Sequence, residues 1–377
     1  MTASSLRLSP LLPSASPPSP STSLPTVHLI QAKTDIDAVL TWLREYESSP
    51  HTFTNYRKEA ERLLYWTQDR GKTLGALSRD DLMDYQRFLA NPQPAEKWVA
   101  PAKPRSHPDW KPFTGPLSAS SQRQALTILN TLFKYLREAG YLAANPLALA
   151  RLGKRRVPAS PTIDRYLEPT LWQKVWSSLD TLPNDTPRAA RQNARARWLL
   201  SLLYLTGARR AEVAQAVMGD IYPRNGMWWW RVVGKGNKVG DIPVGEDLLA
   251  ALAQYRQHLG LGVLPQLGEQ QPLVGRLSAK GQVMPLTDRH ICGLVKAVFA
   301  RTAAQCRATE PAMAAKLEAA STHWLRHTSA THQLDAGVPL LVVSQNLRHS
   351  NIQTTRKYLH TEDDARHAAT QALKLRP

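Results

Sequence analysis

Apolar residues recur every three or four positions in four stretches of the first 150 residues. This spacing puts them on one face of a helix, so it predicts four amphipathic helices that pack together. Folded structure is expected to begin at Thr34. The next three helices carry start signals, which are, in chain order, Thr52 or Thr54, a capping box at Ser78 and Asp81, and Ser120 or Ser121. Gly71 and Gly140 are expected to stop the second and fourth helices. The pattern predicts a small all-α domain over residues 33–150.

The second half of the chain follows the helical pattern except in one place. Helices are predicted over about 170–181 and 188–205. Strand-like sequence follows at 227–233 and 239–244, and the Gly234-Lys235-Gly236-Asn237 segment between them predicts a hairpin. Helices are expected from there to the C-terminus. The expected fold is mainly α with a small β-hairpin or sheet.

Three segments stand outside this pattern. Residues 1–32 are rich in serine and proline, which predicts a disordered tail. Residues 91–116 contain seven prolines, so no regular element is expected there. That segment is interpreted either as a basic loop that lies on a polyanion backbone or as an ordinary surface insertion. Residues 151–162 are interpreted as a linker to a second domain over 163–377, and its cations are Arg151, Lys154, Arg155 and Arg156.

The charge of the chain points to a class of partner. It has 48 Lys and Arg against 30 Asp and Glu, a formal net charge of +18. Such a balance favours a polyanion, because each neutralised phosphate releases counterions, although a merely soluble basic protein is the plainer alternative. Cys292 and Cys306 fit neither a disulfide framework nor a metal-binding spacing, so no metal is expected and a reducing cytoplasm is indicated. No apolar run reaches the roughly 18 residues of a membrane span.

Four polar motifs in the second half contain the residue types for a metal-free phosphoryl transfer. They are Thr206-Gly207-Ala208-Arg209-Arg210-Ala211-Glu212, Gly234-Lys235-Gly236-Asn237-Lys238, His323-Trp324-Leu325-Arg326-His327, and Leu347-Arg348-His349 leading to Tyr358. A tyrosine hydroxyl has a pKa near 10, so it attacks phosphorus well only when a neighbour takes its proton. Taken singly, Arg209 would be an ordinary cation at a helix C-terminus and Tyr358 a packing residue. A zinc site is not favoured, because no cysteine supplies a spaced partner to the histidines.

In this order and spacing, the four motifs resemble those of the tyrosine (phage integrase-type) site-specific DNA recombinases. The resemblance implies an N-terminal helical core-binding (SAM-like) domain and a C-terminal catalytic domain, joined by a linker that crosses the DNA duplex. It implies that DNA is cleaved and rejoined through a 3′-phosphotyrosyl intermediate, with neither metal nor ATP as cofactor. The implied partners are double-stranded DNA at a specific site and, in a homotetramer on two such sites, other copies of the chain. The tail at 362–377 would link neighbouring protomers.

The resemblance also assigns an active site, which consists of Arg209, Lys235, His323, Arg326, His349 and Tyr358. Arg209, Arg326 and His349 would stabilise the negative charge that develops on the non-bridging phosphate oxygens. Glu212 follows Arg209 by one helical turn, and it is expected to hold that arginine in place.

In the implied site, His323 and Lys235 would transfer the protons. His323 is the expected general base for Tyr358, since its ordinary pKa lies near neutral pH. Lys235 is the expected general acid for the leaving 5′-oxygen. Lys238 competes for that role, but it is interpreted more naturally as a DNA contact.

The sequence departs from the family pattern in two places. Arg348 stands where the family usually has glycine, which adds a cation beside the site and brings the turn geometry into question. Residues 302–320 resemble extra helical sequence on the surface, and they lengthen the gap between Lys235 and His323.

Two other functions compete with a recombinase. A type IB topoisomerase uses the same chemistry without choosing a site, and a recombinase-derived DNA-binding protein would not be an enzyme. The spacing of the motifs favours the recombinase over the topoisomerase, and the intact set of six residues argues against the non-catalytic protein. The expected location is the bacterial cytoplasm, on the nucleoid.

Overall fold

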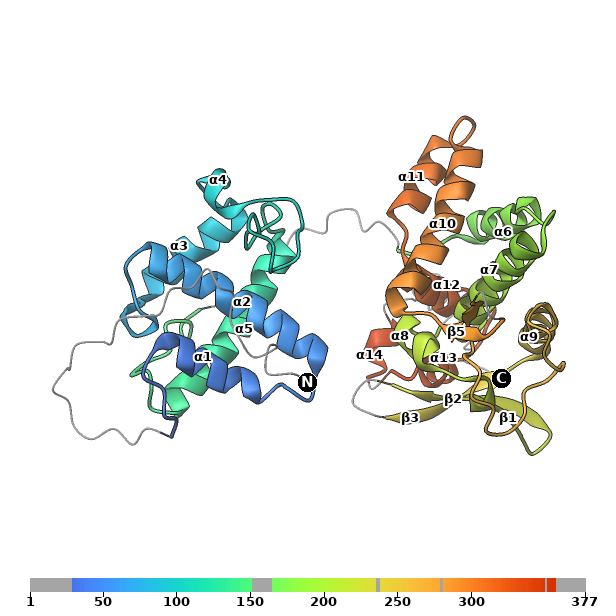
Figure 1. Ribbon diagram of the computed structural model, residues 1–377, viewed down its shortest axis with the longest axis horizontal. Coiled ribbons are helices and arrows are strands. Elements are labelled where there is room, and N and C mark those ends of the chain that lie inside the picture. The colour runs from blue at the N-terminus through green and yellow to red at the C-terminus, as the bar shows by residue number, and fades with distance from the viewer. Residues whose placement is uncertain (1–28, 151–164, 235–237, 279–280, 350, 357–377) are drawn as a thin grey trace, which may run out of the picture. The chain divides into compact units, whose positions relative to one another are not determined.

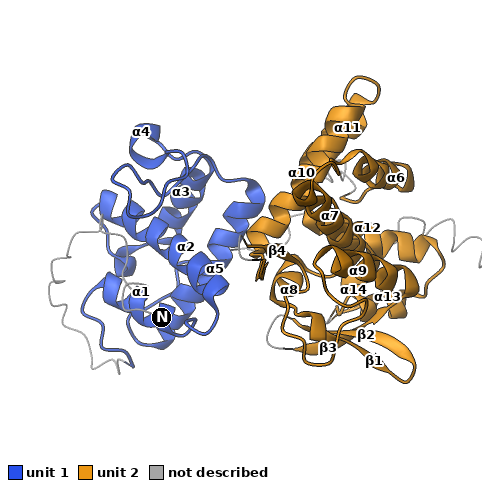
Figure 2. Ribbon diagram, turned by 45° about the vertical axis from the view of Figure 1, so that its right-hand side comes forward, with its two compact units in different colours: residues 1–158 blue, residues 159–377 orange. Residues whose placement is uncertain are grey.

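A computed structural model of the protein describes residues 29–150, 165–234, 238–278, 281–349 and 351–356 (Figure 1). Its internal contacts divide the chain into two compact units, residues 1–158 and 159–377 (Figure 2). Each unit has its own hydrophobic core. The mainly α architecture with small antiparallel sheets that the sequence predicts is confirmed. None of the described helices combines the length and the apolar character needed to cross a lipid bilayer.

The named elements in the described part of unit 1 are all helical. They are α1 (Asp35–Arg44), α2 (Pro50–Asp69), the 3-10 turn η2 (Leu74–Ala76), α3 (Arg79–Ala90), α4 (Ala95–Trp98) and α5 (Ala119–Glu138). Thr34, where folded structure was expected to begin, caps α1, and the predicted capping box at Ser78 and Asp81 is present. Helix α2 begins at Pro50, ahead of the expected Thr52, because proline is well tolerated in the first turn. Helix α5 is capped by Ser118, ahead of the expected Ser120.

The proline-rich segment 91–116 contains a regular element, contrary to expectation. Pro94 caps the one-turn helix α4, where its missing N–H is not needed. Just after α4, the Phe113 N–H donates to the Trp98 carbonyl at 3.2 Å. Both aromatic side chains are buried in the core of unit 1. Burial of these two aromatic side chains therefore fixes two points within a segment that proline content alone marks as irregular.

The cations of this segment are paired inside unit 1. Their partners are Asp69 for Lys97, Asp109 for Lys103, Glu61 for Arg105, and the Glu96 carbonyl for Lys111. Because local acids and a carbonyl already hold these four groups, the interpretation as an ordinary insertion is favoured over a free basic loop.

Unit 2 contains the remaining described elements. They are α6 (Pro169–Ser178), η3 (Leu179–Thr181), α7 (Pro187–Thr206), α8 (Arg210–Gln215), η4 (Met218–Asp220), β1 (Ile221–Arg224), β2 (Met227–Val233), β3 (Val239–Val244), α9 (Glu246–His258), β4 (Gly275–Leu277), β5 (Val283–Pro285), α10 (Asp288–Cys306), α11 (Pro311–Ala319), α12 (Thr322–Asp335), α13 (Leu340–Asn346) and α14 (Gln353–Arg356). The long helix α7 contacts α9, α10 and α12. The leucine-rich end of α7 is buried in the core of the unit.

The main sheet of unit 2 is antiparallel, with strand order β1-β2-β3 (Figure 1). Strands β2 and β3 are the predicted hairpin, in a register that pairs Val233 with Val239. Helices α7 and α13 both contact β3. Two features were not expected: β1 adds a third strand, and β4 and β5 form a second small sheet where only helices were predicted. Strands as short as Gly275–Leu277 leave too little sequence to show a period of two.

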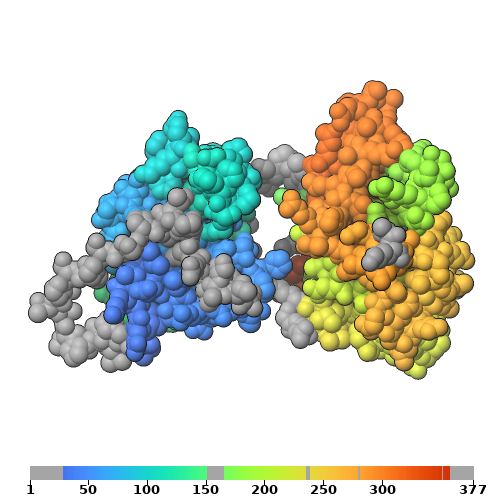
Figure 3. All heavy atoms as spheres, viewed as in Figure 1, coloured from blue at the N-terminus to red at the C-terminus, as the bar shows by residue number. Residues whose placement is uncertain are grey.

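The extra sequence at 302–320 is helical, as predicted, and it forms the end of α10 and all of α11. The two helices stand out together from the rest of unit 2 (Figure 3). They are tied to the unit at the start of α6, where Lys316 pairs with Glu168 and Lys174 with Glu310.

Candidate active site

The turn between α7 and α8 positions the first predicted site residue. Gly207 ends α7 with a φ of +58°, and a Cβ at this position would lie 2.4 Å from Cδ2 of Leu347. Only glycine meets both requirements. The chain then places Arg209 at the N-cap of α8. The Arg209 N–H donates to Oε2 of Glu212 at 2.7 Å, and its Nη1 donates to Oε1 at 2.9 Å.

Arg326 on α12 joins two turns that are far apart in sequence. Its Nη1 donates to the Gly207 carbonyl at 2.6 Å, and its Nη2 donates to the Leu347 carbonyl. The residue is 2% exposed. One buried guanidinium therefore fixes the turn before Arg209 against the turn before His349.

The turn after α13 positions His349. The His349 N–H donates to the Ser344 carbonyl at 3.0 Å, and the Arg348 N–H donates to the Gln345 carbonyl at 2.8 Å. These two bonds form a Schellman motif, whose C′ residue adopts a left-handed conformation. Arg348 is that residue, with a φ of +53°. The His349 ring is then held by the buried Thr355 of α14, whose Oγ1 lies 2.8 Å from Nδ1.

His323 and His327 lie one turn apart on α12, with their rings edge to face at 4.5 Å between centroids. His323 is exposed and His327 is half-buried. Although the His323 side chain keeps contact with water, desolvation by the surrounding protein and the charges of Arg326, Arg209 and Arg165 lower its pKa below the ordinary value. Burial and the neighbouring His323 and Arg326 lower the pKa of His327 to about 4.

The concentration of positive charge also acts on His349 and Glu212. Burial and the charges of Arg326, Arg209 and Arg348 lower the pKa of His349 to about 4. Burial disfavours the ionised form of Glu212, but the charge of Arg348 and the hydrogen bonds from Arg209 outweigh it, so the pKa of Glu212 is lowered. At neutral pH the site therefore holds a carboxylate, several guanidinium groups and neutral imidazoles.

The structure brings together five of the predicted residues: Arg209, Glu212, His323, Arg326 and His349. Lys238 is exposed at the start of β3, and its carbonyl accepts from the Gly234 N–H at 2.8 Å. The predicted Lys235, Tyr358, Arg151, Lys154, Arg155 and Arg156 lie outside the described residues. Across the described ranges, no group of three or more His, Cys, Asp or Glu side chains could hold a metal ion.

Sequence reasoning missed several contributors to this cluster. Thr355 and Arg165 carry no motif signal of their own. Thr355 contributes through its contact with His349, and Arg165 through the effect of its charge on His323. His327 is part of the quoted His323–His327 segment, and its spacing of four residues could have placed it on the same helical face.

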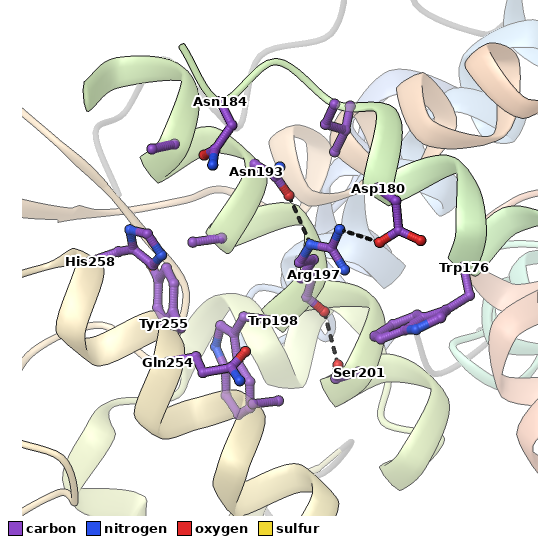
Figure 4. Close-up of a pocket in the computed structure, with 14 residues that line it drawn as sticks. Trp176, Asp180, Asn184, Asn193, Arg197, Trp198, Ser201, Gln254, Tyr255 and His258 are labelled. Carbon is purple, nitrogen blue, oxygen red and sulfur yellow. Dashed lines mark hydrogen bonds and ion pairs between the residues drawn. The ribbon is translucent and has the colours of Figure 1, made fainter. Parts of the chain in front are cut away.

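A separate cavity of 390 Å³ lies between α6, α7 and α9 (Figure 4). At its centre, Arg197 donates to Asn193 at 3.0 Å and to Asp180 at 2.7 Å. The Ser201 hydroxyl donates to the Arg197 carbonyl at 2.9 Å. None of the clustered residues lines this cavity. The cluster, and not the cavity, is therefore the candidate active site.

Comparison with known proteins identifies the family that the chain resembles. The family model described as "Phage integrase family" matches residues 179–365. The tyrosine recombinase XerD of Vibrio cholerae is 29% identical over 327 residues, which cover 86% of this chain and 88% of XerD. The tyrosine recombinase XerC 2 of Ralstonia nicotianae is 29% identical over 335 residues, which cover 87% of this chain and 82% of the relative.

A solved structure shares the fold. The XerH site-specific recombinase, bound to palindromic difH substrate in a post-cleavage complex, superposes with a TM-score of 0.61 and 17% identity. The match covers 90% of this chain and 84% of XerH. The fold, the cluster and the sequence matches together define an enzyme that cleaves and rejoins DNA. The chain belongs to the phage integrase family, the site-specific tyrosine recombinases.

Proposed function

We propose that this recombinase acts through a covalent 3′-phosphotyrosyl intermediate formed by Tyr358. The oxygen of Tyr358 attacks the scissile phosphorus, the bond from phosphorus to the 5′-oxygen breaks, and a free 5′-hydroxyl leaves. One phosphodiester replaces another, so rejoining needs no ATP. The observation that carries the proposal is the convergence of Arg209, Arg326 and His349 in one cluster.

The cluster supplies the charge that this transition state requires. Arg209 is held by Glu212 with part of its side chain exposed, so its remaining donors are available to a phosphate. Arg326 is buried and oriented by two backbone carbonyls, which places a fixed positive charge behind the site. Side chains that are already oriented stabilise developing charge without rearrangement during the reaction.

The histidines supply proton transfer and a neutral hydrogen-bond donor. His323, with a lowered pKa, is unprotonated at neutral pH and can accept the proton of Tyr358. His349 is also neutral, and when its Nδ1 accepts from the Thr355 hydroxyl, its Nε2 carries the proton. That N–H is the donor we assign to a non-bridging oxygen. Lys235 donates the proton to the leaving 5′-oxygen.

No metal ion takes part in this scheme. The positive charge comes from Arg209, Arg326 and Lys235, and the base is an imidazole. The reaction is therefore expected to proceed in the presence of a chelator.

We infer that the substrate is double-stranded DNA at a specific site. XerH is described in complex with its difH substrate, and the Tn1549 integrase with a transposon-end DNA. The net charge of +18 suits such a partner. In this arrangement the helical domain 33–150 and the catalytic domain 163–377 hold the duplex, and the basic linker 151–162 crosses it. Four protomers on two sites, linked by the tail 362–377 and acting in the bacterial cytoplasm, complete the proposal.

The direct test is to trap the covalent complex. The full chain would first select its site from a pool of random duplexes. A nick beside the mapped cleavage point then lets the short 5′-hydroxyl fragment diffuse away, so cleaved enzyme cannot rejoin the strand. The unmutated protein should migrate with labelled DNA on a denaturing gel, and Tyr358→Phe should bind the duplex equally well without forming this adduct. An adduct formed by Tyr358→Phe would show that another residue attacks.

A further inference from the structure

Arg348 has a backbone conformation that residues with a Cβ rarely adopt. Its φ of +53° lies in the left-handed region, where a Cβ is disfavoured and glycine is the usual residue at the C′ position of a Schellman motif. The side chain is only 14% exposed, so its charge is also largely removed from water. The left-handed backbone and the burial of the charge both cost free energy, so this arrangement persists only where surrounding contacts hold it. Strained residues of this kind cluster at functional sites.

The contacts of Arg348 reach two other elements. Its Nη2 pairs with Oε2 of Glu212 on α8, while Oε1 of the same carboxylate holds Arg209. Its aliphatic stem lies against Gly240 of β3, where a Cβ would be 2.9 Å from Cδ and 3.6 Å from Cγ. The Nε and Nη1 atoms are buried without a hydrogen-bond partner among the described residues. The side chain is therefore fixed by one ion pair and by packing on a strand.

The opposite strand of the hairpin approaches the same ion pair. A Cβ on Gly234, at the end of β2, would lie 3.6 Å from Oε1 of Glu212. The Gly234 N–H closes the base of the hairpin by donating to the Lys238 carbonyl. Gly240 on β3 and Gly234 directly after β2 thus each face one member of the Glu212–Arg348 pair.

We propose that Arg348 is a positioning residue that seats the base of the β2–β3 hairpin against the Glu212–Arg209 pair. Lys235 directly follows Gly234 in the sequence, so the proposed seating acts on the step in which this lysine protonates the leaving group. Arg348 does not bind the phosphate in this assignment. The inference rests on the proposed function, because it concerns the step in which the 5′-oxygen leaves.

The test compares Arg348→Gly with the unmutated full chain on two substrates. One is the selected, nicked duplex, and the other has sulfur in place of the bridging 5′-oxygen. A thiolate leaves without protonation because its conjugate acid has a pKa of about 8.5. Arg348→Gly should keep its DNA affinity and its melting temperature, since glycine relieves the backbone. It should cleave the oxygen substrate roughly ten to a hundred times more slowly, as expected for a misplaced catalytic group, and the sulfur substrate at nearly the unmutated rate.

Three further variants distinguish a specific effect of Arg348 on the hairpin base from a nonspecific effect on the fold. Arg348→Lys keeps a cation and a long stem, and it should recover part of the rate on the oxygen substrate. Asn225→Gly relieves the same φ of +53° in the β1–β2 turn, and it should change neither rate. Gly240→Ala should slow cleavage in the unmutated chain but add nothing in the Arg348→Gly background, because the stem it would meet is gone. If Arg348→Gly has a lowered melting temperature, the test uses Gly240→Ala alone. Its slowed cleavage of the oxygen substrate should return to nearly the unmutated rate on the sulfur substrate.

The inference is overturned if Arg348→Gly cleaves the oxygen substrate at the unmutated rate. It is equally overturned if the loss persists with sulfur, or if Gly240→Ala slows both backgrounds to the same degree. Failure of the proposed function has a different signature, because then the unmutated chain forms no covalent adduct at all.

Discussion

The Thr355 Oγ1 and His349 Nδ1 atoms lie 2.8 Å apart, and the Thr355 side chain is completely shielded from water. A buried hydroxyl at this distance fixes which way the imidazole faces. When this hydroxyl donates to Nδ1, the ring proton lies on Nε2, because a nitrogen that accepts a hydrogen bond cannot carry it. The short helix α14, which carries Thr355, therefore orients a residue of the candidate active site.

Replacing Thr355 by valine tests this role. Valine has nearly the same shape without the hydroxyl, so His349 loses its fixed orientation while the packing is kept. We expect the rate of covalent adduct formation to fall by about tenfold, in the range of a disturbed general acid–base or hydrogen-bonding group, with DNA affinity unchanged. Serine should restore most of the rate. Thr354→Val, on the exposed neighbour, is the control that should have no effect.

The histidines on α12 and in the His349 turn predict how stability depends on pH. The folded pKa of His327 and that of His349 are about 4, below the ordinary 6.5. The unfolded chain therefore binds protons first as the pH falls, so the free energy of unfolding should be constant above pH 6.5 and should decrease from there towards pH 4. His327→Gln removes one of these groups, and it should make that acid decrease shallower in thermal or urea unfolding. An equally steep decrease in the variant would contradict the assigned shift.

A chelator tests whether cleavage depends on a metal ion. EDTA should leave the rate of adduct formation unchanged, because arginine, lysine and histidine side chains supply the charge and the proton transfer. Loss of cleavage with EDTA and recovery with Mg²⁺ would overturn the metal-free mechanism.

Salt should weaken DNA binding. The logarithm of the association constant should fall linearly with the logarithm of the salt concentration, because each phosphate contact releases counterions. A flat response would argue against extended contact with the DNA backbone.

Local signals account for what could be predicted from the sequence. The Ser78–Asp81 capping box, the stop at Gly140 and the hairpin around Gly234 are all decided by neighbours within a few residues. The clustering of Arg209 with His349 was inferred from the order of the motifs and a family resemblance, since nothing local brings them together.

The features that could not be predicted from the sequence depend on long-range contacts. The Glu212–Arg348 pair joins residues 136 positions apart, and the left-handed φ of Arg348 is not expected for an arginine. The burial of Trp98 and Phe113 depends on the surface that α3 offers to them, which a count of prolines does not reveal. Such features follow from the assembled core and not from sequence periodicity.

Truncation after Leu359 tests the proposed link between protomers. If the tail 362–377 docks on a neighbouring copy, the shortened chain should still form the covalent adduct on an isolated nicked site. It should lose recombination between two sites, because the tetramer no longer holds together. Both activities are measured on the same selected DNA. Full recombination by the truncated chain would refute the exchange of tails.

The assignment of the general acid is decided by the sulfur-substituted strand. If Lys235 protonates the leaving 5′-oxygen, Lys235→Ala should be severely slowed on ordinary DNA, because an alkoxide is a poor leaving group. The same variant should cleave the sulfur strand about as fast as the unmutated enzyme. Arg326→Ala should gain nothing from sulfur, since its charge serves the non-bridging oxygens that remain in place. Rescue of Lys238→Ala in place of Lys235→Ala would exchange the roles of the two lysines. Absence of rescue in both would leave the hairpin as a DNA contact alone.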